Sequence, residues 1–125
     1  MQTPKLSSKL FLIILIVAFF IRCSPSRDAE PPLHDAALRG NVKKVEELIR
    51  SGVNVNSRNG EGATPLHWAA YKGQLEVAKI LLMNGAKIND LTTKGTTPLR
   101  LAMDSKETEM IRYLTSQGGL EDVDQ

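Results

Sequence analysis

The feature that most constrains the fold is a short motif that recurs along the chain at a constant step of 33 residues. Its clearest copy is residues 64–70, Thr-Pro-Leu-His-Trp-Ala-Ala, and partial copies stand at residues 31–37 and 97–103. Three glycines keep the same step: Gly52, Gly85 and Gly118. A fixed period of this length is typical of stacked repeats, in which each unit buries its apolar face only against its neighbours. The sequence therefore predicts a repeat architecture.

The central unit predicts two short helices. Thr64 is suited to cap a helix through its hydroxyl, and Pro65 suits the first helical position, where no backbone N–H is needed. Apolar residues then recur at helical spacing in residues 66–70 and again in residues 75–82. Gly73 separates the two stretches, and Gly85 can adopt the left-handed conformation that ends a helix. The predicted fold class is therefore all-α, with two helices in each repeat.

At these residues the sequence resembles the ankyrin repeat family, whose unit is a turn followed by two antiparallel helices with the signature Thr-Pro-Leu-His-x-Ala. The resemblance implies a solenoid of three helix-turn-helix repeats with short finger turns between them. It places a repeat domain at residues 32–120, divided at about 31–58, 59–89 and 90–120. It also implies a scaffold that binds other proteins and has no catalysis of its own.

The resemblance also implies where a partner would bind. In that family, binding residues lie on the finger tips and at the end of each first helix, and together they line a concave groove. Matching by register gives ten residues: Leu38, Arg39, Arg58, Glu61, Tyr71, Lys72, Leu91, Lys94, Asp104 and Ser105. Tyr71 is the best single anchor, because large aromatic side chains dominate interface energies. Trp68 stands beside this set, and we interpret it first as inter-helix packing and second as a binding anchor.

Metal binding and catalysis find little support in the sequence. His34 and His67 lie one repeat apart at equivalent positions, where the family resemblance implies a structural histidine. Neither has a carboxylate or cysteine at ligand spacing, so we expect no metal and no cofactor. The chain has no nucleophile elbow and no glycine-rich phosphate loop. We therefore expect no enzyme and no small-molecule substrate.

The first 22 residues have the composition of a secretory signal peptide. Lys5 and Lys9 precede an uncharged apolar run of 12 residues, 10–21. As a helix this run would reach only about 18 Å, which is too short to span the hydrocarbon core of a membrane comfortably. A positive segment followed by such a run indicates export.

Cys23, the only cysteine, follows this run directly. The arrangement resembles a bacterial lipoprotein signal, which implies lipid on Cys23 and a membrane anchor, with residues 23–31 as lipidated cysteine and tether. Arg22 occupies the place where lipoprotein signals normally have a small residue. Ordinary cleavage nearby and an uncleaved anchor remain as alternatives.

Charge gives no support for nucleic-acid binding. Removal of residues 1–22 takes away three of the 16 basic residues, which leaves 13 against 14 acidic residues and a net charge of −1. The basic character of the whole chain thus belongs to the signal segment. Residues 121–125 form an acidic tail, which we expect to be frayed.

The predicted function is protein binding by an exported module whose partner shares the envelope or the extracellular space. The location is a membrane-anchored lipoprotein or the periplasm, with secretion as the alternative. Two other functions remain open, namely an inhibitor or immunity-type protein that blocks an enzyme or toxin, and a membrane-tethered structural adaptor. Inhibition predicts that the partner loses activity on binding, whereas an adaptor leaves that activity unchanged.

Overall fold

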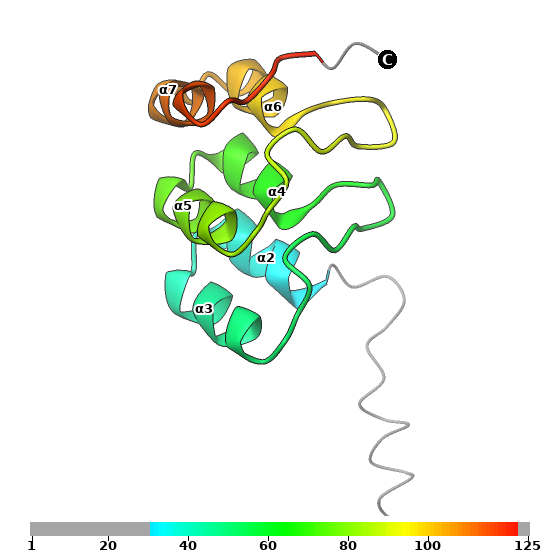
Figure 1. Cartoon of the computed structure of the whole chain (residues 1–125), viewed down its shortest axis with the longest axis vertical. Helices are drawn as coiled ribbons and strands as arrows, with labels where there is room; N and C mark the ends of the chain where they lie inside the picture. Colours follow the sequence, from blue (N-terminus) through cyan, green and yellow to red (C-terminus); the bar gives the residue numbers. More distant parts are fainter. Residues whose placement is uncertain (1–30, 123–125) are drawn as a thin grey trace, which may run out of the picture.

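The computed structural model describes residues 31–122, and these residues form six helices in three stacked pairs (Figure 1). The helices are α2 (Pro32–Arg39), α3 (Val42–Arg50), α4 (Pro65–Lys72), α5 (Leu75–Met83), α6 (Pro98–Asp104) and α7 (Thr108–Ser116). In Figure 1 α2, α4 and α6 form an inner row and α3, α5 and α7 an outer row, while the connecting fingers project on the opposite side. The predicted signal segment, Cys23, most of the tether and residues 123–125 lie outside the described residues.

The buried core repeats with the sequence register. Leucines at one equivalent position, Leu33, Leu66 and Leu99, are at most 4% exposed. The alanines three residues later, at positions 36, 69 and 102, are equally buried, and their small side chains let the inner helices approach closely. Burial of one leucine side chain contributes about 1.5–3 kcal/mol. The predicted two-helix unit is therefore confirmed, with its apolar faces buried between repeats.

Each motif histidine joins its own repeat to the next. Nε2 of His34 donates to the carbonyl of Ala63 at 2.9 Å, and Nε2 of His67 donates to the carbonyl of Thr96 at 3.0 Å. Nδ1 of His67 accepts from the backbone N–H of Thr64 at 3.0 Å, so the neutral imidazole fits this site. Burial lowers the pKa of His67, although its hydrogen bond to Thr96 acts in the opposite direction. The structural role predicted for these histidines is confirmed.

Two asparagines hold successive loops together. The side-chain amide of Asn56 donates to the carbonyl of Gly85 at 3.0 Å, and its oxygen accepts from the N–H of Lys87 at 2.8 Å. One repeat later, Asn89 makes the same pair of bonds to Gly118 and Leu120, at 3.2 and 2.8 Å. These bonds fix the spacing of the loops along the stack.

The start of the acidic tail is also held. The hydroxyl of Thr97 donates to the carbonyl of Leu120 at 2.7 Å and lies 3.1 Å from the carbonyl of Glu121. The backbone of Glu121, the first residue of the predicted tail, is therefore in contact with the third repeat, and the prediction for the rest of the tail stays a prediction.

The junction between inner and outer helix needs a left-handed backbone in every repeat. Gly40 and Gly73 have φ of 69° and 66°, but the third repeat places Lys106 there, with φ of 61°. The next residue reaches back to the preceding repeat. In repeat two Gln74 donates its amide N–H to the carbonyl of Leu38 at 3.1 Å, and its side chain packs over Gly40. In repeat three Glu107 packs over Gly73 in the same way.

Candidate functional site

The fingers of repeats two and three form one side of the candidate site, and they are bonded to each other. Thr93 donates to the carbonyl of Glu61 through its backbone N–H at 3.0 Å and its hydroxyl at 2.9 Å. Gly62, between them, has φ of 72°, and a Cβ there would lie 2.9 Å from the nitrogen of Thr93. A side chain at position 62 would therefore separate the fingers. The close contact makes this wall of the site rigid.

An arginine strengthens the base of the same wall. The guanidinium of Arg58 forms an ion pair with Asp90 and donates to the carbonyl of Leu91 at 2.9 Å. The side chain of Arg58 thus joins two consecutive fingers through these contacts.

Between the bonded fingers and the inner helices lies a pocket of about 390 Å³, which we call the concave pocket. Its walls include Glu61, Trp68, Tyr71, Thr93, Lys94 and Leu101. The rings of Trp68 and Tyr71 meet nearly at right angles, at 81°, with centroids 6.4 Å apart. This edge-to-face arrangement fixes two large aromatic surfaces at one corner of the pocket.

The structure brings four of the ten predicted binding residues together at this pocket. Glu61, Tyr71 and Lys94 line it, and the ammonium of Lys72 lies 5.5 Å from the ring centroid of Tyr71. Tyr71 is 41% exposed, and Glu61, Lys72 and Lys94 are exposed as well. Their side chains form none of the ion pairs found in residues 31–122.

The other six predicted residues do not line the pocket, and most of them make contacts within the stack. Arg58 and Leu91 join the fingers as described above, and Leu38 supplies the carbonyl bound by Gln74. The remaining three bond within their own helices: Arg39 with Asp35 at 2.8 Å, Asp104 with Arg100 at 3.4 Å, and Ser105 with the carbonyl of Leu101 at 2.7 Å. The role of all ten residues in partner binding stays a prediction.

The sequence analysis placed Trp68 beside the predicted binding residues and did not include its counterpart Leu101 among them. Both are half-buried and both line the pocket. The sequence contained an indication of this pair, because Trp68 and Leu101 are apolar whereas the equivalent residue of repeat one, Asp35, is charged. An apolar pair at this position therefore arises only between repeats two and three, where the pocket lies.

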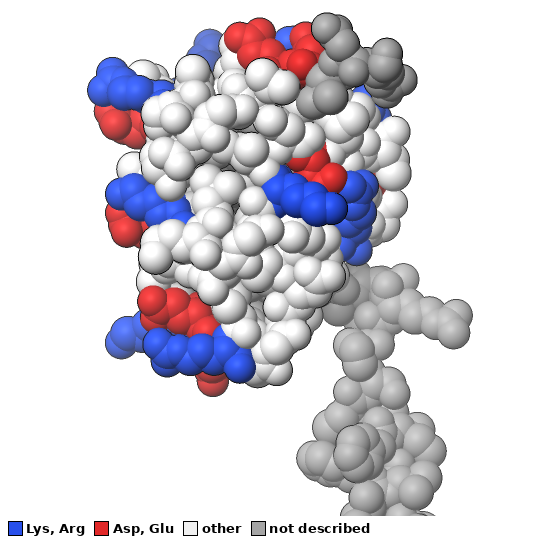
Figure 2. Space-filling model, in the orientation of Figure 1, with Lys and Arg blue, Asp and Glu red and all other residues white. Residues whose placement is uncertain are grey.

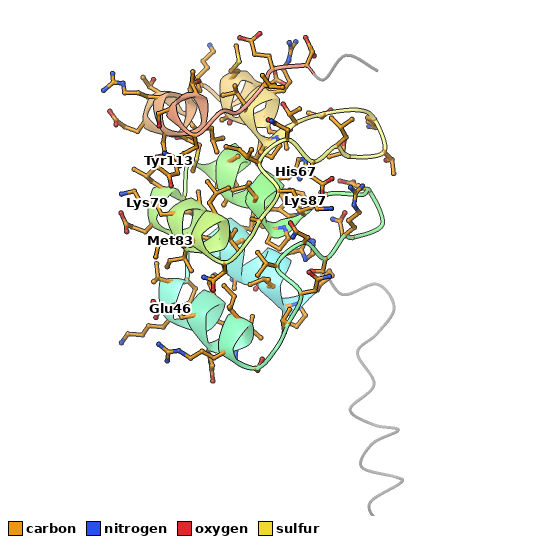
Figure 3. All side chains as sticks on the ribbon, viewed as in Figure 1. Glu46, His67, Lys79, Met83, Lys87 and Tyr113 are labelled. Carbon is orange, nitrogen blue, oxygen red and sulfur yellow. The ribbon has the colours of Figure 1, made fainter. Side chains whose placement is uncertain are left out.

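A second, smaller hollow of about 210 Å³ lies between the outer helices α3 and α5. Its walls include Glu46 and Arg50, together with Ile49, Ile80 and Met83. Figure 3 labels Glu46 and Met83 on this outer row, on the opposite side from the fingers. Met83 is 85% exposed, but no aromatic side chain joins it in this hollow.

Within residues 31–122 no three His, Cys, Asp or Glu side chains gather closely enough to hold a metal ion. No helix of that part of the chain has the length and apolar character that crossing a membrane requires. The candidate site is the concave pocket, with apolar walls and charged side chains at its rim.

The repeat unit identified by packing is matched by comparison with known proteins. A family profile described as ankyrin repeats (3 copies) matches residues 12–92 and 33–125. The chain belongs to the ankyrin repeat family. The crystal structure of the human ASB11 ankyrin repeat domain is similar to it, with 36% sequence identity and a TM-score of 0.71 over 76% of this chain. The match covers 43% of that domain, and comparison with curated proteins gives no match.

Membership of this family indicates a broad class of function. Ankyrin repeats are protein–protein interaction modules and are generally non-catalytic. The all-helical solenoid predicted from the sequence is confirmed, and the structural neighbour shares it.

Proposed function

We propose that the protein is a non-catalytic interaction module that binds a protein partner on its concave surface, with the concave pocket at the centre of the contact. One observation carries this proposal. Glu61, Lys94 and the exposed Tyr71 line an apolar pocket, and Lys72 lies beside Tyr71. The three charged side chains form no ion pair within residues 31–122. An apolar centre with a polar rim is the usual anatomy of a protein–protein interface.

The outer helices have a different charge pattern. Each carries an ion pair three residues apart on its own surface: Lys44 with Glu47 at 3.1 Å, Lys79 with Glu76 at 3.0 Å, and Arg112 with Glu109 at 3.8 Å. Figure 2 shows positive and negative side chains in adjacent groups along the edge of the outer row. Charges that already have partners attract another protein less than the unpaired charges around the pocket.

The proposed binding site can be tested on the purified complex with a partner captured from the native envelope. Tyr71→Ala should weaken binding by about 1–3 kcal/mol, because such aromatics are typical hot spots. Lys43→Ala and Glu47→Ala on the outer surface of α3 should bind as the wild type does. Circular dichroism must show that all three variants remain folded. Loss of binding in the α3 variants together with retention in Tyr71→Ala would place the contact on the outer helices instead.

We also propose export and anchoring through lipid on Cys23, with secretion as the alternative. The support is the sequence of residues 1–23, which lie outside the described part of the structure. Mature protein should partition into detergent, and Cys23→Ser should release it or leave it unprocessed. An intact mass that shows another N-terminus and no lipid would refute the anchor while leaving the binding proposal untouched.

The captured partner also separates the two other functions that the sequence left open. If the partner is an enzyme or toxin and loses activity in the complex, the module is an inhibitor. If the partner keeps its activity and is held at the membrane, the module is an adaptor. Measurement of the partner's activity with increasing amounts of the module therefore distinguishes them.

A further inference from the structure

We infer that the concave pocket takes one large apolar side chain from a partner segment that carries carboxylates on both sides of that side chain. This inference rests on the proposed function and names the chemistry of the partner at the same site. It follows from the pocket walls, from the balance of charge around them and from where those charges stand.

The pocket walls select an apolar anchor. Trp68, Tyr71 and Leu101 supply the largest apolar surfaces, and the two aromatic rings are fixed edge to face. The volume of about 390 Å³ is at the lower end of the range of small-molecule sites, which is about 300–1,000 Å³. One aromatic or branched aliphatic side chain can bury much of its surface against such walls.

The charges around the pocket favour an acidic segment. Glu61 and Lys94 line the pocket, Lys72 lies beside it against the ring of Tyr71, and none of the three forms an ion pair within residues 31–122. These three side chains together carry one net positive charge. The neighbouring charges at the fingers, Arg58 and Asp90, neutralise each other. A carboxylate from the partner is therefore attracted by Lys72 and Lys94, whose charges no carboxylate of residues 31–122 neutralises in an ion pair.

The same arrangement disfavours a cationic anchor, although two aromatic rings and a carboxylate could suggest one. The ammonium of Lys72 already lies over the ring of Tyr71, at 5.5 Å from its centroid. A second cation at this corner would be repelled by Lys72, and Lys94 would repel it as well. The aromatic corner is thus better suited to an uncharged side chain.

The positions of the lysines place partner carboxylates on both sides of the anchor. Lys94 comes from the finger of repeat three, whereas Lys72 is the last residue of α4 on the inner row. A segment that crosses from the finger to the end of α4 meets Lys94 first, then the pocket, then Lys72. An acidic residue on each side of the apolar residue satisfies both lysines.

A displayed library of random peptides tests this inference without bias toward any composition, with the full mature protein as bait. We expect enriched peptides to share a Phe, Leu, Ile or Trp with Asp or Glu on both sides. One enriched peptide is then titrated against the protein by the fluorescence of Trp68, the single tryptophan of the chain, which lines the pocket. Replacement of its apolar residue by Ala, or of its acidic residues by Lys, should weaken binding about tenfold or more.

Two charge reversals of the protein complete the test. Lys94→Glu should remove the preference for acidic flanks, whereas the matched change Lys43→Glu on α3 should leave it intact. Enrichment of basic or uncharged flanks, an unchanged preference in Lys94→Glu, or no enrichment at all would overturn the inference. The proposed function is judged separately by the native partner. If the peptide tests fail but Tyr71→Ala prevents capture of that partner, the proposed concave binding site is supported and only the inferred chemistry of the partner is refuted.

Discussion

The substitution Lys106→Gly should stabilise the protein, although it removes a side chain. Lys106 has φ of 61° and is the only non-glycine residue with positive φ within residues 31–122. The equivalent positions in repeats one and two are Gly40 and Gly73. The hydrogen bonds at the three junctions are equivalent as well, and in repeat three the N–H of Lys106 donates to the carbonyl of Met103 at 3.0 Å. The backbone conformation is therefore imposed by the repeat, and lysine adopts it at a cost.

The expected gain is the difference of two opposing effects. A side-chain-bearing residue pays about 1–2 kcal/mol for the left-handed conformation, because its Cβ approaches the following carbonyl oxygen. Glycine avoids this cost but has more freedom to lose from the unfolded chain, which offsets about 0.4–1 kcal/mol. The exposed side chain of Lys106 makes no ion pair within the described residues, so little else changes. The net gain should be about 0.5–1 kcal/mol, which corresponds to a rise in Tm of about 2–8 °C for a domain of this size.

Urea unfolding followed by circular dichroism measures this gain, with an unchanged m-value as the sign that only stability has changed. Lys106→Ala is the matched control. It removes the same side chain but keeps a Cβ, so it should be no more stable than the wild type. If Lys106→Ala and Lys106→Gly have the same midpoint, the gain does not come from the backbone conformation and the argument from repeat register is wrong.

Three further predictions use the same unfolding assay. Glu107→Gln should add about 0.5–1.5 kcal/mol, because an amide at this position can donate to the carbonyl of Tyr71 as its counterpart does one repeat earlier, whereas a carboxylate cannot. No gain would mean that the side chain does not reach that carbonyl. Leu81→Ala should cost about 2–5 kcal/mol, because Leu81 is fully buried in the middle repeat. Leu48→Ala at the half-buried equivalent position should cost less, and equal costs would contradict the packing described. Burial lowers the pKa of His67 in the folded state, so the unfolded chain binds the proton first and stability should fall as the pH drops below about 6.5. The slope from this residue should reach at most about 1.4 kcal/mol per pH unit and should be absent in His67→Gln.

The fold could be predicted from the sequence because its determinants are local and repeated. Helix α3, Val42–Arg50, is an example, since a capping asparagine precedes it and its apolar residues have helical spacing. The structural role of His67 was implied by the family resemblance, because His67 occupies the histidine position of the repeat signature. Each of these features depends on residues within one repeat or at a fixed step of 33, so a single sequence carries the information.

The candidate site could be predicted only in part. The repeat register shows which residues the packing of the stack does not require, but it does not show which of these residues pair with one another. Arg58 looked free in the sequence, yet it joins Asp90, which lies 32 residues away in the next finger. The hydrogen bond from the hydroxyl of Thr97 to the carbonyl of Leu120 was not predicted for a similar reason. A hydroxyl that caps one helix can also bond a distant carbonyl, and no sequence periodicity marks such a contact. The pocket itself depends on Trp68 and Leu101 facing each other across a repeat boundary, which requires the stacked geometry.

Comparison of the repeats with one another separates packing from recognition. At the first core position all three repeats have leucine, and all three side chains are at most 4% exposed. At the position occupied by Tyr71, the other repeats have Leu38 and Asp104, and at the finger tips Glu61 is replaced by Lys94. Packing between equivalent neighbours favours the same residue at positions such as this leucine, whereas a partner touches each repeat with different atoms and has no such preference. The concave surface is therefore released from the symmetry of the stack, and its residues can differ from one repeat to the next.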